Sequence, residues 1–437
     1  MGVDRPTIDR AIGSDLRLAV IGGGWAGLAA AVRATEAGYR VTLFEMAGHW
    51  GGRARGVDVD GLALDNGQHI LIGAYLRTLA LMATVGADAA NHLHRQPLEL
   101  RYPDGRGLRL PQGPAWLGFG VAVAGCVGWS WRDRLMLMVE AGRWALAGFR
   151  CAPALTVDAL CRRLPPAVRQ LLINPLCVAA LNTPAAAASA QVFLRVLQDA
   201  LFSGQGSADL LLPRRDLGTL LPVPAAQWLS GHGASLQLGK RVMQLRHDGT
   251  DWLVDEQPFA AVILACSAHE AARLAHPHAP AWAAAAQTIT YEPIVTVYLH
   301  CSGAHLPSVM TALIDGPEAP AQYAFDHGAL GASPGVFAFV ISGARAWADR
   351  GLEAAGKAVL QQALSAFPPG TWPTAPTVLR VMAEKRATFR CTPALARPPP
   401  VVVPGLIAAG DYITGPYPAT LEGAVRSGEV AVDLLSP

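Results

Sequence analysis

The chain has few charged side chains and lacks the patterns of several common functions. Asp, Glu, Lys and Arg make up 16% of its 437 residues, against roughly 25% in an ordinary soluble domain. Its 35 basic and 33 acidic side chains leave a net charge of +2. No long basic run or basic–aromatic interleaving occurs, so nucleic acid is not an expected partner.

Cysteine and histidine patterns give no sign of a disulfide framework or a metal site. The seven cysteines are scattered singly and form no C-x-x-C pair, which favours a reducing cytoplasm. The two close histidine pairs, His92/His94 and His276/His278, have no further ligands at metal spacing, so we interpret them as surface loops. Residues 1–15 lack the apolar core of a signal peptide, so export is not predicted and a cytoplasmic location is expected.

Apolar side chains are abundant instead. Hydrophobic residues make up 51% of the chain, and the mean hydropathy is +0.28. An apolar excess without a charge excess suggests an oily substrate or membrane contact, although an alanine-rich buried core explains part of it.

The start of the chain predicts one strand–turn–helix–strand unit. An apolar strand over 16–21 is followed by a glycine-rich turn and an alanine-rich helix that ends near Ala37, with Gly38 at its C-terminus. A second strand covers 40–45, and the short connection implies that the two strands are parallel.

The turn of this unit carries a dinucleotide-binding motif. Gly22, Gly24 and Gly27 fit G-x-G-x-x-G in the strand–helix context that a dinucleotide-binding loop requires. Glu45 closes the second strand, where a carboxylate accepts hydrogen bonds from ribose hydroxyls.

Further along, the pattern predicts inserted segments. Hairpins are expected over 98–110 and 242–254, strands over 260–266, 291–301 and 406–409, and mostly helix over 113–227. The predicted fold is α/β with α+β inserts: a discontinuous Rossmann-type domain carrying an inserted substrate domain of mixed sheet and helices. We assign 16–110, 235–275 and 400–437 to the nucleotide-binding domain, 111–234 to a helical, substrate- or membrane-facing region, and 276–399 to a β-rich substrate domain.

Two further elements favour FAD over NAD. The stretch 51–55 (Gly-Gly-Arg-Ala-Arg) follows Glu45 and offers backbone N–H groups and an arginine fork to a phosphate. Near the other chain end, Gly410-Asp411 follows a strand, and 420–424 opens the last helix. That helix N-terminus would stabilise negative charge on a reduced isoalloxazine. The predicted FAD contacts are Gly22, Gly24, Trp25, Ala26, Gly27, Glu45, Gly52, Arg53, Arg55, Gly67, Gln68, Val242, Gly410, Asp411, Thr420, Leu421 and Ala424.

These separated elements, in this order, resemble the flavin amine oxidase and phytoene desaturase superfamily. Within it, the chain is most similar to the squalene-associated FAD-dependent desaturases, or hydroxysqualene dehydroxylases. The stretches that carry this similarity are 65–69 with 73–75, 210–213, 384–389 and 410–412 with Gly415. The resemblance implies reductive removal of the hydroxyl of hydroxysqualene to give squalene for hopanoid synthesis. Hydride would pass from reduced flavin to an allylic carbon, and the substrate would be a long apolar isoprenoid.

Such a reaction needs a proton donor for the departing hydroxyl. His69 is the first choice, although a histidine hydrogen-bonded within its loop accounts for it as well. Tyr417 and Tyr412 are rival donors that could also shield a cation. Lys385 is included because flavin oxidases of the superfamily often place a lysine near the flavin, but we slightly prefer a solvated strand end. The reductant is not identified by any motif.

The stretch 116–131 is almost wholly apolar and shorter than the roughly 20 residues that span a bilayer. Its terminal tryptophans and the arginines that follow suit insertion into one leaflet, so 113–134 is a candidate for peripheral contact with the inner face of the membrane. A buried hairpin or helix on the substrate domain explains it equally well.

Three alternatives remain open at this point. A carotenoid-type desaturase or a flavin amine oxidase would share the fold and begin from oxidised flavin. A non-enzymatic escort protein would use the pocket only to hold an isoprenoid, and we would expect its phosphate loop to be degraded.

Overall fold

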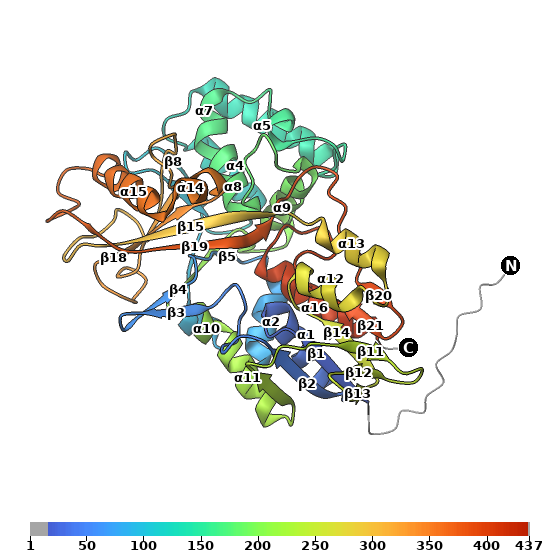
Figure 1. Ribbon diagram of the computed structural model, residues 1–437. Coiled ribbons are helices and arrows are strands. Elements are labelled where there is room, and N and C mark those ends of the chain that lie inside the picture. Colours follow the sequence, from blue (N-terminus) through green and yellow to red (C-terminus); the bar gives the residue numbers. More distant parts are fainter. Residues whose placement is uncertain (1–15, 436–437) are drawn as a thin grey trace.

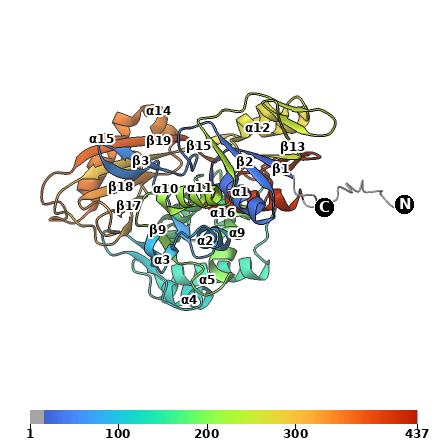
Figure 2. The same cartoon turned by 90° about the horizontal axis from the view of Figure 1, so that it is seen from below.

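The computed structural model describes residues 16–435 and divides into three parts. Figure 1 shows the nucleotide-binding part at lower right, a sheet that includes β15, β18 and β19 at the left, and a group of helices at the top. The view from below (Figure 2) places α4 and α5 on the side opposite α12. The part of the chain that the structure describes contains no helix long and apolar enough to cross a membrane.

The nucleotide-binding part is built on a six-stranded sheet in the order β10-β2-β1-β14-β21-β20. Its first five strands are parallel, and only β20 runs antiparallel to its neighbour. The predicted discontinuous Rossmann-type domain is therefore confirmed, since strands from three distant segments share one sheet. The strands are β1 (Arg17–Ile21), β2 (Arg40–Glu45), β10 (Ser235–Leu238), β14 (Ala261–Leu264), β20 (Val401–Val403) and β21 (Leu406–Ala408).

Both faces of this sheet are covered, which explains its near-continuous apolar strands. In β1, Leu18 and Val20 belong to the core shared with α1 and α16, whereas Ala19 and Ile21 belong to the core on the other face. Helices α1 and α16 pack closely, because a Cβ at Gly428 would lie 2.2 Å from the Ala26 carbonyl oxygen. The covering elements are α1 (Trp25–Glu36), α2 (Leu76–Thr84), α11 (Pro222–Gly231) and α16 (Leu421–Asp433) on one side, and β11 (Leu245–His247), β12 (Trp252–Val254), β13 (Gln257–Phe259), α12 (Ala268–Ala275) and α13 (Pro280–Gln287) on the other.

The second part is a five-stranded antiparallel sheet in the order β16-β17-β18-β15-β19. Two helices pack against it near Val381 and its neighbours, and the long strands β15 and β19 run from it toward the nucleotide-binding part (Figure 1). Its elements are β15 (Tyr291–His300), β16 (Met310–Ala312), β17 (Tyr323–Asp326), β18 (Val336–Ile341), α14 (Arg345–Arg350), α15 (Leu352–Ala366) and β19 (Thr377–Phe389).

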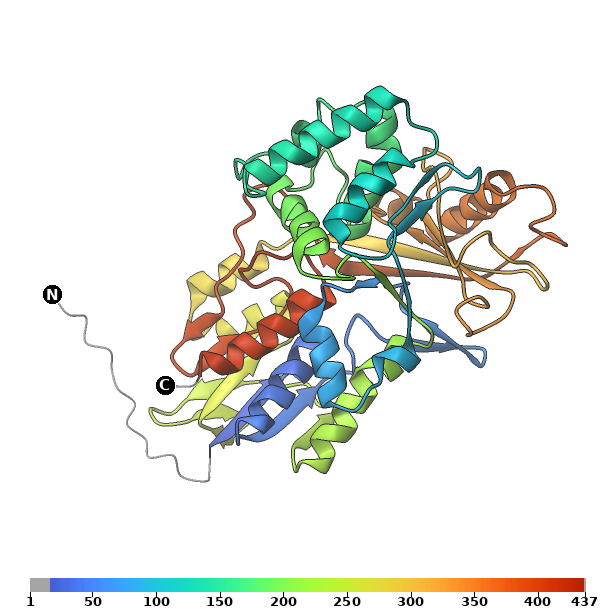
Figure 3. The same cartoon turned by 180° about the vertical axis from the view of Figure 1, so that it is seen from behind.

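The third part is helical, as expected for most of 113–227, and Figure 3 shows it along the top from behind. It contains α4 (Ala115–Ala124), α5 (Trp131–Leu146), α6 (Val157–Leu160), α7 (Pro166–Val168), η1 (Arg169–Ile173), α8 (Asn174–Leu181) and α9 (Ala190–Phe202). Helix α5 begins with a capping box, in which Ser130 and Asp133 satisfy each other's backbone N–H groups.

Some short elements that precede the expected boundary at 234 pack with the N-terminal segment rather than with the helical part. Strand β9 (Leu210–Pro213) pairs with β5 (Leu71–Ile72) and β6 (Leu93–Gln96), so 210–213 lies with the N-terminal segment. Leu217 and Leu220 of α10 (Leu217–Leu220) share a buried core with α1. The remaining elements are β3 (Gly56–Val59), β4 (Leu62–Asp65), α3 (Ala89–His92), and the hairpin of β7 (Glu99–Arg101) and β8 (Gly107–Arg109) that turns at the expected Gly105.

Candidate active site

One continuous cavity of about 640 Å³ begins at the glycine-rich turn after β1 and extends between the helical part and the five-stranded sheet. Its first end is lined by Gly22, Gly24 and Glu45. Its other end is lined by apolar side chains, with Trp116 and Phe202 at the surface. A groove for a dinucleotide and a space for an apolar molecule are therefore joined.

The glycine-rich turn has the geometry that its motif predicts. Gly22 has φ +117, and a Cβ there would lie 2.5 Å from the Ala265 carbonyl oxygen. A Cβ at Gly27 would lie 1.8 Å from the Gly22 carbonyl oxygen, so Gly27 permits the close approach of helix and strand. At Gly24 a Cβ would meet nothing within 4 Å, and the residue lines the cavity. The space in front of Gly24 is therefore open, as a pyrophosphate-binding turn requires.

Glu45 organises this turn as well as facing the cavity. Its Oε2 accepts a hydrogen bond from the Gly23 amide at 2.6 Å, and its Oε1 accepts one from the Ala47 amide at 2.7 Å. Each carboxylate oxygen keeps a further lone pair. The carboxylate can therefore hold the turn and still accept hydrogen bonds from a ribose.

Arg53 links the two ends of the chain. Its Nη2 donates to Asp411 Oδ1 at 2.7 Å, and its Nη1 donates to the carbonyl oxygens of Arg386 and Ala387. The sequence predicts that Arg53 reaches a phosphate, and the structure shows that much of its donor capacity is directed to Asp411 and β19. Asp411 is 9% exposed and lines the cavity.

Tyr412 carries a polar atom that the protein leaves unsatisfied. Its side chain is 1% exposed, and its hydroxyl has no hydrogen-bond partner within residues 16–435. Tyr412 lines the cavity with Cys266 and Asp411, at the dinucleotide end. A buried, unsatisfied hydroxyl, an open space at Gly24 and a carboxylate with free lone pairs together fit a bound dinucleotide.

His69 lies in the loop after β4 and has a defined tautomer. Its Nδ1 is 2.7 Å from the Gly67 carbonyl oxygen, so Nδ1 carries the proton and Nε2 presents a lone pair. Burial lowers the pKa of His69, and the charge of Arg53 lowers it further, against the bond to Gly67. His69 is therefore neutral at neutral pH. The neighbouring Gln68 is held at Oε1 by His327, 3.0 Å away.

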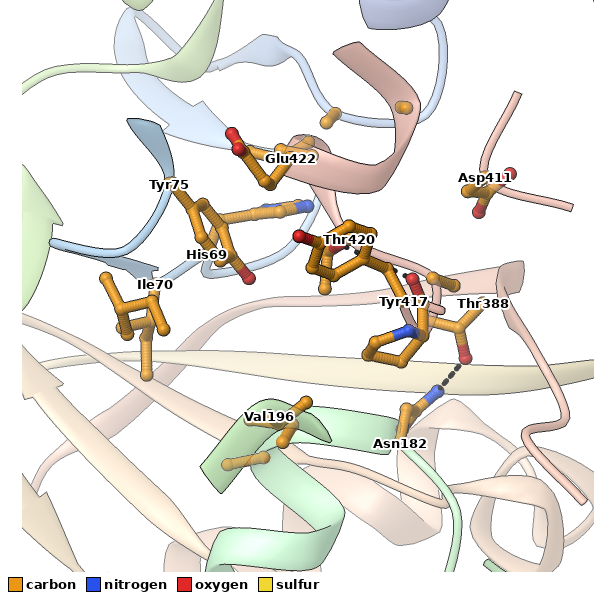
Figure 4. A pocket seen from close by; sticks show the side chains of 18 of the residues that line it. His69, Ile70, Tyr75, Asn182, Val196, Thr388, Asp411, Tyr417, Thr420 and Glu422 are labelled. Atoms are coloured by element: carbon orange, nitrogen blue, oxygen red, sulfur yellow. Dashed lines mark hydrogen bonds between the residues drawn. The ribbon is translucent and has the colours of Figure 1, made fainter. Parts of the chain in front are cut away.

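Tyr417 faces the cavity from the segment between β21 and α16 (Figure 4). Arg195 of α9 donates from Nη2 to the Tyr417 hydroxyl at 3.2 Å and is itself paired with Asp199. The guanidinium groups of Arg195 and Arg426 lie 5.2 and 5.3 Å from the ring centroid. The ring is thus already engaged by cations, but the hydroxyl proton has no acceptor in the described chain.

Helix α16 opens beside this tyrosine. The Thr420 hydroxyl accepts from the Gly423 amide at 3.0 Å and caps the helix. Tyr75 lines the cavity near this helix end (Figure 4). Glu422 is turned away to α2, where it accepts from the amides of Arg77 and Thr78. Thr420, which caps α16, and Leu421, its first residue, line the cavity, so the N-terminus of this helix lies at the cavity wall.

The structure gathers most of the predicted residues at this one cavity. Every predicted FAD contact lines it except Gly27, which packs the turn, and Arg55. Of the catalytic candidates, His69, Tyr412 and Tyr417 line the cavity. Lys385 is exposed and does not line the cavity, and it lies inside β19 rather than at the strand end that we expected.

Several lining or supporting residues carry no sequence signal. Asn182 follows α8, Thr388 lies in β19, and the two are hydrogen-bonded in the cavity wall (Figure 4). Arg195 and His327 likewise act from distant elements. No motif joins such pairs in the sequence, because only folding brings them together.

Comparison with known proteins gives consistent results along the whole chain. The family described as flavin containing amine oxidoreductase matches residues 25–435. The hydroxysqualene dehydroxylase of Rhodopseudomonas palustris is 28% identical, over 95% of this chain and 97% of that protein. The hydroxysqualene dehydroxylase of Zymomonas mobilis is 26% identical, over 95% and 98%.

Solved structures share the fold. An oxidoreductase from Methanosarcina mazei superposes with a TM-score of 0.74, covering 96% of this chain and 100% of the other. The sequence identity is 15%, so this likeness concerns the architecture alone.

Proposed function

The chain belongs to the flavin containing amine oxidoreductase family and is an FAD-dependent oxidoreductase, and from that premise we propose that it removes the hydroxyl of hydroxysqualene to give squalene. The escort alternative does not apply to an enzyme with an intact phosphate loop. The observation that carries the proposal is the apolar cavity that continues from the dinucleotide groove. Full-length similarity to hydroxysqualene dehydroxylases supports it.

The apolar arm of the cavity suits a long hydrocarbon chain. Apolar side chains from the β7–β8 hairpin and the residue before it, α4, α5, η1, α9 and the five-stranded sheet form its walls: Leu98, Leu108, Phe119, Trp144, Leu172, Leu197, Phe202, Met310 and Phe325. Burying an isoprenoid against such walls contributes roughly 25 cal/mol per Å² of apolar area. A flexible amine or a polar metabolite would gain little from this environment.

The proposed reaction has a simple balance. The C–O bond breaks, a proton and a hydride are added, and the products are squalene and water. When FAD is bound in its reduced form, it supplies the hydride. The protein must supply the proton, exclude bulk water and hold the allylic carbon at the dinucleotide end of the cavity.

We propose Tyr417 as the proton donor, in preference to His69. The neutral His69 points a lone pair, not a proton, out of Nε2, so it must first be protonated. The Tyr417 hydroxyl receives a hydrogen bond from Arg195 and keeps its own proton available. The positive charge of Arg195 stabilises the phenolate that remains after transfer. Tyr412 is assigned to the cofactor side, because its unsatisfied hydroxyl is buried near Cys266 and Asp411.

We also propose that the substrate enters from a lipid membrane. Large apolar side chains are exposed on α4, α5 and the loop between them: Trp116, Leu117, Val121, Val127, Trp131, Leu135, Met138, Val139 and Leu146. We call these nine residues the α4–α5 face. Trp116 belongs to this face and also lines the cavity, so the open end of the cavity lies at its border. Arg132 lies over the Trp131 ring at 5.4 Å, where its charge can meet anionic headgroups.

Product analysis tests the proposed reaction. Anaerobic protein, reduced with dithionite, is incubated with hydroxysqualene, and the extract is examined by mass spectrometry. We expect squalene, with one equivalent of flavin oxidised for each molecule formed. Unchanged hydroxysqualene, together with desaturation of phytoene by the oxidised protein, would instead establish a desaturase.

A further inference from the structure

The wall opposite Tyr417 contains an asparagine whose hydrogen bonds are all committed to the protein. Asn182 follows α8 with φ +46 and is 4% exposed. Its Oδ1 accepts from the Gly343 amide at 2.7 Å. Its Nδ2 donates to the Glu292 carbonyl oxygen at 3.2 Å and to Thr388 Oγ1 at 2.9 Å. Asn182 is therefore fixed, and its amide donates to Thr388 within the cavity wall.

The Thr388 hydroxyl is consequently oriented as a donor. Its oxygen accepts from Asn182, and no acceptor for its proton exists within residues 16–435. Thr388 lines the cavity, and Figure 4 shows its bond to Asn182 in the wall below Tyr417. The preceding residue, Ala387, is held through its carbonyl oxygen by Arg53 at 3.0 Å. Thr388 thus lies where β19 reaches the dinucleotide end of the cavity.

Apolar side chains line other parts of the same cavity. Ile294 and Val340 line the cavity from the same sheet, and Val196 lines it from α9 (Figure 4). A donor on the wall of this cavity is costly to leave without an acceptor when an apolar ligand displaces water. A ligand with an oxygen at this point satisfies it, and donation from Asn182 strengthens the bond.

From these contacts we infer that Thr388 is a specificity-determining residue, which donates a hydrogen bond to the hydroxyl oxygen of the substrate and selects oxygenated over purely hydrocarbon isoprenoids. Asn182 is its positioning residue. The inference deepens the proposed function and rests on it for the substrate class. It also gives a reason for product release, because squalene lacks the oxygen that Thr388 requires.

Binding to the oxidised holoenzyme tests this inference without turnover. Hydroxysqualene and squalene are titrated separately in detergent micelles, and the change in flavin absorbance or fluorescence gives each Kd. In Thr388→Val the shape is kept and the donor is lost. We expect hydroxysqualene to bind about 3- to 10-fold more weakly while squalene binding is unchanged or tighter. Thr388→Ser should restore the preference.

Thr377→Val is the matched control, since Thr377 lies on the same strand with an exposed side chain that bonds to the His300 carbonyl oxygen. It should leave both Kd values unchanged. An equal loss for both ligands in Thr388→Val, or no loss at all, would overturn the inference. If the preference is lost as expected while reduced wild-type protein fails to form squalene, the oxygen site stands and the proposed reaction falls.

Discussion

Arg53 and Asp411 form an ion pair at 2.7 Å, although 358 positions separate them in the sequence. Arg53 follows the glycine-rich turn, and Asp411 follows the last strand of the parallel sheet. Arg53 also donates to the carbonyl oxygens of Arg386 and Ala387 in β19. The pair therefore joins both ends of the nucleotide-binding part to the substrate sheet.

Breaking this pair should weaken FAD binding and the fold together. In Asp411→Asn the charge is lost while the side-chain size is kept. We expect at least a 10-fold rise in the Kd for FAD and a loss of about 1–2 kcal/mol of stability, which is modest because Arg53 is partly exposed. A double-mutant cycle with Arg53→Met, followed by urea unfolding, checks the coupling. Additive effects of the two substitutions would contradict it.

Gly24→Val should prevent FAD binding without unfolding the protein. A Cβ at Gly24 meets no atom within 4 Å and the backbone has φ −78, so valine is accommodated but fills the pyrophosphate space. The purified variant should be colourless and should not take up added FAD. Gly142→Val, at another open position, serves as the control. A yellow Gly24→Val protein with full flavin content would disprove the assignment of this turn.

Tyr417→Phe should slow dehydroxylation by about 100-fold, the lower range for loss of a general acid. Burial raises the pKa of Tyr417, and the carboxylate of Asp199 raises it further, against the effects of Arg426 and Arg195. A phenol is active as an acid when protonated, so the wild-type rate should fall only above the ordinary tyrosine pKa of about 10.

In Arg195→Met, the fall in rate at alkaline pH should move to higher pH, because the positive charge that favours the phenolate is lost. Single-turnover rates measured against pH show both effects, and an unchanged rate in Tyr417→Phe would exclude the role.

Asp65 should make the protein less stable as the pH rises. Burial raises the pKa of Asp65 from 3.8 to about 8, and Asp216 adds to this, against a hydrogen bond from the Leu217 amide. The folded state therefore binds more protons than the unfolded state between these values, and stability declines from about pH 4 to about pH 8. Asp65→Asn keeps an acceptor for Leu217 and should be more stable by about 1–3 kcal/mol at pH 8. Urea unfolding at pH 5 and pH 8 measures the difference, and equal pH dependence in both proteins would refute it.

Val121→Glu should reduce binding to lipid vesicles. Val121 is 63% exposed on the α4–α5 face, so the change costs the folded protein little, but it places a charge at the membrane. We expect a several-fold loss of co-sedimentation with anionic vesicles. Met243→Glu is the matched control, because Met243 is 60% exposed on the nucleotide-binding part. Equal binding by the two variants would argue against this face.

Much of the nucleotide-binding part could be predicted because its signals are local. The turn after β1, the closing Glu45 and the opening of α16 each occupy a few consecutive residues, and backbone sterics and hydrogen bonding fix their geometry. The structure confirms the fold, and the family confirms FAD. The boundary near residue 234 was less predictable, since the pairing of β9 with β5 and β6 depends on contacts between distant segments.

The amino-acid sequence alone thus determined the coenzyme, because the features typical of an FAD site (a glycine-rich turn, a carboxylate that closes the second strand and a helix N-terminus) each lie within a few consecutive residues. Only the tertiary structure decided which face of 116–131 is exposed, which proton of His69 is committed, and that Asn182 orients Thr388. These properties depend on how side chains from separate elements come together in the fold. The spacing of residues along the chain does not predict such contacts between distant residues.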